Sequence, residues 1–404
     1  MVSIARKNLL EDLPRLLVAQ AGITFAVSLI GVQTGILNGF TNSVTLVIDN
    51  SQADIWVTSK DFLHLSLTLP LPAERVNQAR AVPGVAKAEP LLINNTLWRD
   101  PQGKIEAVQM IGYEPDAELF KPWDLIGGAQ PSIVEQEHAI IIDDTNTKLL
   151  GVNNIGDVVQ VGGVTAKVKA FTHGVYSFVA SPFVFTSLES GRDFLSSRTI
   201  PASSTQSTSL LEASRLATEA QKASSGPIPI PYILIRAQPG QDLQQLKQAL
   251  EQALPDTQAH TRAELSELTQ RYWRDETGIG FVLSLGAGLG LVVGTVIVGQ
   301  VLYASAVDHI REFGTLKAMG ASNWYIYRVI GEQALWMAVL GFASGMGVCY
   351  GIGTWAQATQ GIAILISPAT AAGVFGVTVL MCVGSAVFAI QKVTQVDPVI
   401  VFKA

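Results

Sequence analysis

Three long stretches without a charged side chain constrain this chain more than any other feature of its sequence. Asp, Glu, Lys and Arg are all absent from 16–48, from 277–307 and from 333–391. A helix needs roughly 20 apolar residues to cross the hydrocarbon core of a bilayer, which is about 30 Å thick. The first two stretches are each long enough for one crossing. The third is long enough for two, and two glutamines and Pro368 mark a break near its middle.

We therefore expect a membrane protein with four transmembrane helices, at 16–40, 278–304, 333–354 and 369–390. Four buried helices of a soluble protein are the alternative, but uncharged stretches of this length are too long for a soluble core. The N-terminal stretch follows a basic segment, as in a secretory signal peptide. Its apolar region exceeds the usual ~7–15 residues of such a peptide, which favours an uncleaved anchor.

Basic residues indicate which side of the membrane each loop occupies. Lys and Arg outnumber Asp and Glu in 1–15, in 308–330 and in 391–404, whereas 41–277 holds 19 basic and 27 acidic residues. Cytoplasmic loops of membrane proteins carry an excess of Lys and Arg. We therefore expect both termini and 308–330 in the cytoplasm and the large loop 41–277 in the periplasm. This topology describes a multi-pass protein of the inner (plasma) membrane.

The loop 41–277 is long enough to bury one or two hydrophobic cores, and its patterns are those of an α+β domain. Two similar strand–helix–strand units are expected near its two ends, and they could pair in space. The first begins with a strand at 52–59 and a helix at 73–82, and the second comprises a strand at 231–238, a helix at 240–254 and a strand at 256–261.

A β-rich subdomain is expected as an insertion between these units, at about 113–230. A hairpin turn is indicated before it, at Asp100–Gly103. Within it, 196–231 is rich in Ser, Thr and Pro at both ends, which is typical of a flexible connection, and an amphipathic helix is expected between those ends.

The segment 262–278 precedes the second expected transmembrane helix and has apolar residues at helical spacing. We interpret it as an outward extension of that helix, a stalk, with Tyr272 and Trp273 near the membrane interface, where amphipathic rings prefer to lie. A plain surface helix is the alternative.

The sequence offers no constellation of residues for catalysis. It lacks the G-x-x-x-x-G-K-[ST] loop that binds nucleotide phosphates, so this chain cannot hydrolyse ATP by that route. Its five histidines are scattered, and we expect no metal site. Cys349 and Cys382 lie in expected transmembrane helices, where packing is their simplest role. We therefore expect a protein that is not an enzyme, holds no cofactor itself and has no nucleic-acid partner.

The charged segment 308–330 separates two strongly apolar blocks. Residues 308–319 can continue the preceding helix, Gly320 is a good helix stop and Ser322 a good N-cap for the next helix. The segment therefore reads as a compact cytoplasmic helical hairpin, whose apolar side needs a partner or the membrane. A structural loop without a partner is the alternative.

Three glycines at a spacing of four residues suit close helix packing in lipid. They are Gly286, Gly290 and Gly294, in the middle of the second expected transmembrane helix. They could bring together two copies of the chain, or serve packing within one copy.

The stretch R-E-F-G-T-L-K-A-M-G-A at 311–321 resembles the signature of the FtsX/MacB-type ABC transporter permeases. The order of one helix, a large outer domain and three further helices is similar to theirs, and VTQVDPVIVF at 393–402 resembles their closing segment. Within the family, the sequences around 272–285 and 293–309 look most similar to the DevC-type permeases of cyanobacterial DevBCA exporters.

The resemblance implies porter-like and sabre-like outer subdomains and a mechanotransmission mechanism without a substrate channel. It implies a homodimer with a separate ABC ATPase that binds ATP and Mg, a membrane-fusion (periplasmic adaptor) protein, an outer-membrane channel of TolC type and a possible glycolipid substrate. It also implies that the ATPase-coupling residues are Arg311, Glu312, Phe313, Gly314, Leu316, Lys317, Met319 and Gly320.

Other functions stay open at this point. An FtsX-like membrane regulator of cell-wall hydrolases is one, although such members usually have a smaller outer domain. A lipoprotein-releasing permease is another, and it would need lipid-facing hooks. A membrane sensor would need a cytoplasmic signalling module, for which the cytoplasmic segments are too short.

Overall fold

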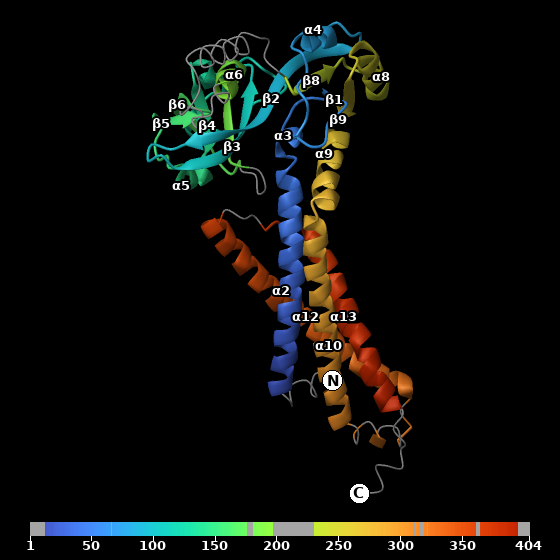
Figure 1. Ribbon diagram of the computed structural model, residues 1–404. Coiled ribbons are helices and arrows are strands. Elements are labelled where there is room, and N and C mark those ends of the chain that lie inside the picture. The colour runs from blue at the N-terminus through green and yellow to red at the C-terminus, as the bar shows by residue number, and fades with distance from the viewer. Residues whose placement is uncertain are drawn as a thin grey trace, which may run out of the picture. The chain divides into compact units, whose positions relative to one another are not determined.

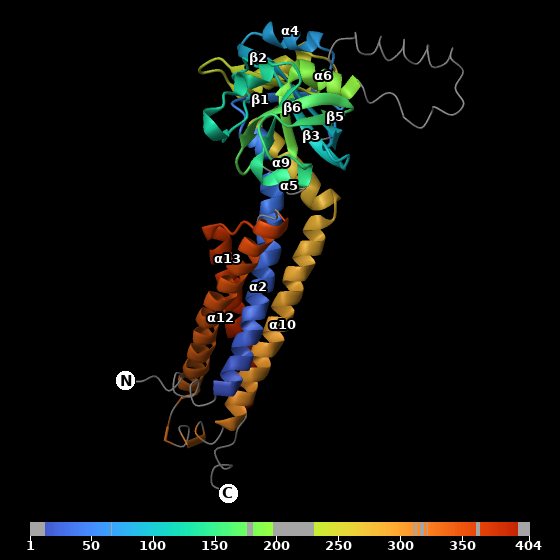
Figure 2. The ribbon, with the colours of Figure 1, turned by 90° about the vertical axis from the view of Figure 1, so that its left-hand side faces the viewer.

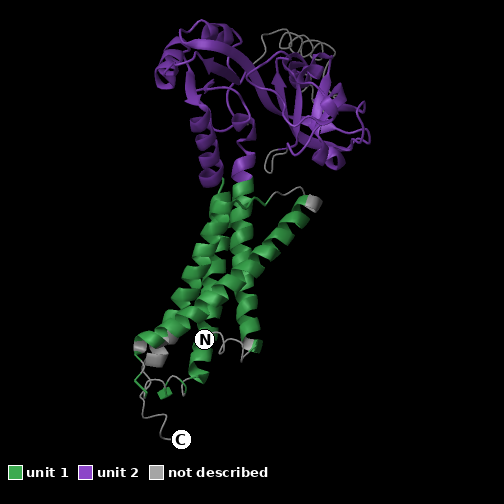
Figure 3. Cartoon of the chain, turned by 180° about the vertical axis from the view of Figure 1, so that it is seen from behind, with its two compact units in different colours: residues 1–39, 277–404 green, residues 40–276 purple. Residues whose placement is uncertain are grey.

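The computed structural model divides into two compact units, shown in different colours in Figure 3. We call residues 40–276 the sheet unit, and residues 1–39 with 277–404 the helical unit. The structure describes residues 13–65, 67–175, 181–196, 230–309, 312, 314–315, 319–320, 322–360 and 364–394. The expected connection at 196–231 lies almost wholly outside the described residues.

Four strands of the sheet unit form an antiparallel sheet in the order β2-β8-β1-β9 (Figure 1). Its elements are β1 (Ile55–Ser59), α4 (Glu74–Arg80), β2 (Val85–Arg99), β8 (Tyr232–Ala237), α8 (Leu243–Ala253) and β9 (Thr257–Thr261). The two strand–helix–strand units interleave, because β1 lies between both strands of the second unit. This is the split βαβ arrangement. The expected pairing of the two units is confirmed.

One face of this sheet is buried beneath the two helices. Val76 of α4 and Leu246 and Leu250 of α8 pack against Ile55 and Ile233 of the central strands in one hydrophobic core. Leu246 and Leu250 are four residues apart and therefore lie on the same side of α8. The helices thus fix the sheet from one side.

The remaining strands close into a ring of six, in the order β3-β7-β4-β6-β5-β2, and β2 also pairs with β3. The added strands are β3 (Ile105–Tyr113), β4 (Ala139–Asp143), β5 (Val158–Val161), β6 (Val164–Thr172) and β7 (Phe183–Ser187). Alternate side chains, including Val108 and Met110, Ile140 and Ile142, and Val159 and Val161, share one core. Such alternation places them on one side of the closed sheet.

Strand β2 belongs to both subdomains. The inserted β-rich subdomain therefore begins before residue 113, where its start was expected. Its first half, through Leu91, pairs with β8, and from Leu91 to Arg99 it pairs with β3. The expected hairpin around residues 100–103 is confirmed, with Gly103 at φ +88°. The ring subdomain therefore begins within β2, because its closure needs the second half of that strand.

Short helices complete the sheet unit. They are α3 (Leu46–Asp49), η1 (Ile126–Gly128), η2 (Pro131–Glu135), η3 (Asp144–Asn146), α5 (Thr147–Leu150), α6 (Leu188–Ser196), α9 (Arg262–Arg271) and the π-helix η5 (Tyr272–Glu276). Gly162 has a φ of +60°, and a Cβ there would overlap the carbonyl of Phe194 in α6. Only glycine fits this close approach of a hairpin turn to a helix.

The expected stalk is not one continuous helix with the second transmembrane helix. The side chains of Thr261 and Glu264 form a capping box that starts α9. Helix α9 continues directly into η5. The helical conformation is then interrupted at Thr277 and Gly278, and Gly278 has a φ of +72°. The helical repeat of residues 262–272 was read correctly, but its continuation through the glycine was wrong.

The helical unit contains α2 (Leu13–Ser43, which runs into the sheet unit), α10 (Ile279–Asp308), α12 (Asn323–Gln360) and α13 (Pro368–Thr394), shown in Figure 2. In the part of the chain that the structure describes, four segments are long and apolar enough to cross a membrane: Leu16–Ser43, Ile279–Asp308, Tyr327–Gln357 and Pro368–Val387. Buried residues of all four helices, among them Ile23, Val298, Met337 and Met381, share one hydrophobic core.

Candidate functional site

The segment between α10 and α12 carries the expected coupling residues. Glu312, Gly314 and Thr315 are helical, and the backbone N–H of Met319 donates to the carbonyl of Thr315 at 3.0 Å. Gly320 follows with a φ of +95°, a conformation that favours glycine at a helix end. The predicted coupling residues Arg311, Phe313, Leu316 and Lys317 lie outside the described residues.

The described residues of this segment differ in their exposure. Glu312 is exposed and Met319 is 72% exposed, whereas Gly314 is buried. Trp324, in the first turn of α12, is 75% exposed and was not among the predicted coupling residues. Its signal in the sequence was a large aromatic residue directly after the helix stop. Met319 and Trp324 therefore present large apolar surface beside the turn at Gly320.

The glycine row of α10 faces other helices of the same chain. A Cβ on Gly290 would lie 3.2 Å from Leu29 and 3.3 Å from Ile30, and one on Gly286 would lie 2.7 Å from Gln33. One on Gly294 would meet Met381 as well as α2. The glycines thus let α10 approach α2 and α13 closely, which is packing within one copy.

A polar seam joins α2 to α12 and was missed in the sequence. Thr24 and Ser344 lie 2.6 Å apart through their hydroxyl oxygens, and the Ser28 hydroxyl lies 3.1 Å from the carbonyl oxygen of Gly345. The amide of Gln20 also donates to Ser344 at 3.4 Å. The signal was the four-residue spacing of Gln20, Thr24 and Ser28, which places them on one side of a helix.

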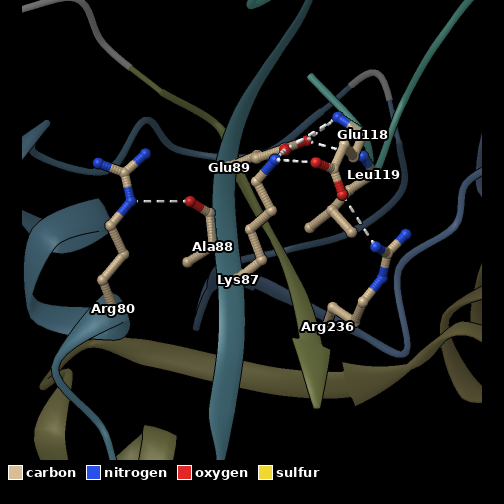
Figure 4. A network of polar contacts seen from close by, with 7 residues as sticks. All are labelled: Arg80, Lys87, Ala88, Glu89, Glu118, Leu119 and Arg236. Carbon is tan, nitrogen blue, oxygen red and sulfur yellow. Dashed lines mark hydrogen bonds and ion pairs between the residues drawn. The ribbon is translucent and has the colours of Figure 1, made fainter. Parts of the chain in front are cut away.

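In the sheet unit, a charged network lies where β2 leaves the four-stranded sheet (Figure 4). The buried carboxylate of Glu89 accepts hydrogen bonds from the backbone N–H groups of Glu118 at 2.9 Å and Leu119 at 2.8 Å. Lys87 is 2.8 Å from Glu89 and 3.1 Å from Glu118, and Arg236 of β8 is 3.1 Å from Glu118.

The network shifts the protonation equilibria of its exposed members. The hydrogen bond to Glu89 is the main cause that raises the pKa of Lys87. The hydrogen bond from Lys87 is likewise the main cause that lowers the pKa of Glu118. Each charge stabilises its neighbour, so the segment after β3 is held against β8 and against β2, the strand that both subdomains share.

Metal and acid–base chemistry find no support among the residues that the structure describes. They contain no group of three or more His, Cys, Asp or Glu side chains that could hold a metal ion. Two histidine–carboxylate pairs occur, His173 with Asp144 at 2.9 Å and His138 with Asp193 at 3.3 Å, on the ring subdomain.

Two family models match the sequence. The FtsX-like permease C-terminal model matches residues 284–398, and the MacB-like periplasmic core domain model matches residues 16–253, more than half of the chain. The chain belongs to the FtsX/MacB-type family of ABC transporter permeases. Members of this family are permease subunits that are not themselves catalytic, with membrane helices and a periplasmic domain.

Solved structures with similarity to this FtsX/MacB-type permease include three periplasmic or extracellular regions. The periplasmic region of MacB from Actinobacillus actinomycetemcomitans has 9% identity and a TM-score of 0.35, with 55% of this chain and 94% of that chain covered. The extracellular domain of the noncanonic ABC-type transporter YknZ from Gram-positive bacteria has 12% identity and a TM-score of 0.32, with 52% and 99% covered.

A domain of a putative permease protein from Porphyromonas gingivalis has 13% identity and a TM-score of 0.32, with 52% of this chain and 89% of that chain covered. Among curated proteins, none matches the sequence.

Proposed function

We propose that this permease is the membrane subunit of an ABC exporter of the MacB-like mechanotransmission type. A separate ATPase would bind the segment 308–330, and its ATP-driven motion would pass through the membrane helices to the periplasmic sheet unit. The observations that carry the proposal are the sequence of this segment and its turn at Gly320, between α10 and α12, in a chain of the permease family. The family implies an ABC ATPase partner, and this chain has no phosphate-binding loop of its own.

The two connections between the units support a mechanical role. The sheet unit joins the helical unit only at residues 39–40 and 276–277. Within the sheet unit, the segments leading to these connections are bonded to each other. Arg262 of α9 donates to the carbonyl of Ser51 at 3.0 Å, and Gln270 donates to the hydroxyl of Thr45 at 3.5 Å. A displacement of either connection would therefore be shared by the other.

The homodimer, the membrane-fusion protein, the outer-membrane channel and a glycolipid substrate belong to the same proposal. The fusion protein and the channel follow from the family's exporters, the homodimer from the coupling segment 308–330, and the glycolipid from the likeness to DevC-type permeases around 272–285 and 293–309. Both termini in the cytoplasm follow from the basic flanks. The glycine row of α10 no longer motivates the homodimer, because those glycines face helices of their own chain.

An FtsX-like regulator of cell-wall hydrolases would also bind an ATPase, so the experiment has two steps. The permease is co-expressed with the P-loop ATPase encoded in its genomic neighbourhood, and the bound ATPase is measured for Phe313→Ala and Lys317→Ala. Loss of a buried interface anchor often costs 2 kcal/mol or more, about thirtyfold in affinity, whereas a rim charge costs less. We expect Phe313→Ala to lose more ATPase than Lys317→Ala.

Tyr350→Ala is the control, because this exposed α12 side chain lies far along the helix from the turn. Normal ATPase binding by Phe313→Ala would contradict the coupling role. The second step adds a candidate fusion protein to the purified complex. Binding of a fusion protein supports export, and stimulation of a wall hydrolase without such binding supports the regulator.

A further inference from the structure

The loop between β1 and α4 exposes three leucines on an otherwise charged unit. Between Asp61 and Glu74 there is no Asp, Glu, Lys or Arg, and leucine occurs at every second position from 63 to 71. Leu65 and Leu71 are buried, whereas Leu63, Leu67 and Leu69 are 53%, 52% and 54% exposed. We call residues 62–72 the leucine loop. The loop therefore buries two of its leucines and exposes the other three.

The leucine loop is held in place by hydrogen bonds, so its exposure is built into the fold. The backbone N–H of Leu67 donates to the carbonyl of His64 at 2.8 Å, and that of Leu71 donates to Ile230 at 2.8 Å. The buried hydroxyl of Tyr232 donates to the carbonyl of Leu65 at 2.7 Å. These bonds hold His64, Leu65, Leu67 and Leu71 in place.

Aromatic contacts connect the leucine loop to the segment that leads into α10. The ring of His64 stacks on Tyr272 with 4.7 Å between centroids and meets Trp273 edge-on at 5.1 Å. Trp273 in turn meets Phe40 at 5.8 Å, and Phe40 lies within the apolar segment Leu16–Ser43. The loop therefore packs against residues of the sheet unit that, along the chain, lie at the end of one long apolar segment and just before another.

Chain length limits how far this contact lies from the bilayer. Trp273 lies six positions before Ile279, where α10 begins, and an extended chain spans at most about 3.6 Å per position, or about 22 Å in all. Trp and Tyr side chains are enriched at membrane–water interfaces. His64, Tyr272 and Trp273 thus form an aromatic group within about 22 Å of the start of α10.

We propose that Leu63, Leu67 and Leu69 of the leucine loop insert into the periplasmic leaflet of the bilayer. A lipid surface suits an uncharged apolar patch, because amphipathic surface segments bury apolar side chains at the headgroup–acyl boundary. The aromatic residues beside the patch are also close, along the chain, to two long apolar segments. This contact would anchor the sheet unit at its membrane-proximal end during transport.

Two further features agree with a lipid contact. Burial lowers the pKa of His64, so its ring is uncharged at neutral pH and does not oppose insertion. An open cavity of about 310 Å³ adjoins the loop, and its walls combine Phe62, Leu63 and Leu268 with Arg271 and Asp275. Apolar and charged groups of both signs suit the zwitterionic headgroup region.

The inference requires α10 to cross the membrane but does not depend on the coupling of 308–330 to an ATPase. The two proposals can therefore fail separately. The test uses the full chain in lipid nanodiscs, with Cys349→Ala and Cys382→Ala to remove the native thiols. Single cysteines are introduced as Leu63→Cys, Leu67→Cys or Leu69→Cys and labelled with an environment-sensitive fluorophore. Ile155→Cys is the matched control, since Ile155 is 62% exposed on the ring subdomain.

We expect lipids that carry a doxyl quencher near the headgroup to quench labels at 63, 67 and 69 at least threefold more than the label at 155. Aqueous iodide should show the reverse order. Labels in the loop that iodide quenches as strongly as at 155 would overturn the proposal. Protection from both quenchers would overturn it too, because a protein, such as a second copy, would then cover the loop. Three labelling positions guard against one variant that fails to fold.

Discussion

The carboxylate of Glu89 accepts the backbone N–H of Leu119 at 2.8 Å, which joins the strand shared by both subdomains to the segment after β3. Glu89 is only 2% exposed and also binds the N–H of Glu118. Replacing one partner of a buried charged hydrogen bond leaves the other groups unsatisfied, at a cost of about 1–3 kcal/mol. We expect Glu89→Ala to destabilise the full chain by about 2–4 kcal/mol, measured as thermal unfolding in detergent.

Lys87→Met is the control for that prediction. Lys87 is more than one-third exposed, and exposed ion pairs contribute less than about 1 kcal/mol. Equal unfolding temperatures for Glu89→Ala and Lys87→Met would show that the backbone contacts of Glu89 do not hold the two subdomains together.

Acidification should destabilise the chain partly through His64. Burial lowers the pKa of His64 from its ordinary 6.5, so the folded state keeps the ring neutral where the unfolded state already binds a proton. Stability is therefore present above about pH 6.5 and is lost as the pH falls from there through the folded pKa. His64→Phe retains an aromatic ring beside Tyr272 but cannot titrate.

The difference in unfolding temperature between pH 7.5 and pH 5.5 should thus be smaller in His64→Phe than in the wild type. His260→Phe provides a comparison, since burial lowers the pKa of His260 as well. An unchanged pH difference in both variants would rule out buried histidines as a cause of acid sensitivity.

Local patterns were sufficient to predict most elements of the fold but not its closure. The apolar stretches indicated the long helices, and the alternation in 52–59 and 231–238 indicated β1 and β8, because both signals depend on neighbours along the chain. The ring was missed because it depends on one strand, β2, changing partners at Leu91. That change brings together strands far apart in sequence, and no short pattern encodes it.

Part of the local structure of the segment 308–330 was also predictable. Gly320 was identified as a helix end from its residue type, and its φ of +95° explains why glycine is used there. The burial of Gly314 and the partners of the α10 glycines depend on which helix packs against which. A spacing of four residues predicts a close contact but not the helix that makes it.

Gly290→Leu and Gly288→Leu form a matched pair on α10. A Cβ on Gly290 meets Leu29, Ile30 and the backbone of Ala26 within 3.4 Å, whereas one on Gly288 meets no described atom within 4 Å. Overpacking of this kind typically costs about 1–3 kcal/mol. We expect Gly290→Leu to lower the unfolding temperature in detergent and Gly288→Leu to leave it nearly unchanged.

Light scattering of the same two variants measures their oligomeric state. It distinguishes glycines that pack helices within one copy from glycines that join two copies. If Gly290→Leu converted a dimer to a monomer without lowering the unfolding temperature, the row would serve contact between copies, and the packing seen within the chain would not explain it.

Topology gives a further prediction. With Cys349 and Cys382 replaced by alanine, Ser203→Cys should react with a membrane-impermeant thiol reagent in intact spheroplasts, because 41–277 is expected outside the cytoplasm. Ser322→Cys, next to the start of α12, should react only after lysis. Labelling of Ser322→Cys in intact spheroplasts, or of Ser203→Cys only after lysis, would refute the expected orientation.

The last prediction concerns the surface at the turn between α10 and α12. Met319 is exposed in the chain alone, so Met319→Asp should leave folding intact while it places an unpaired charge in any apolar contact with an ATPase. Gly314 is buried, so Gly314→Leu meets the chain's own atoms and should reduce stability as well as coupling. We expect Met319→Asp to keep the wild-type unfolding temperature but lose at least tenfold in ATPase affinity. Gly314→Leu should lower both the unfolding temperature and the ATPase affinity.

Each variant is purified in nanodiscs, and its unfolding temperature, bound ATPase and ATP turnover are compared with those of Tyr350→Ala. Wild-type ATPase affinity in Met319→Asp would place the contact elsewhere than this turn. A stable Gly314→Leu chain without ATP stimulation would instead show that Gly314 faces the partner.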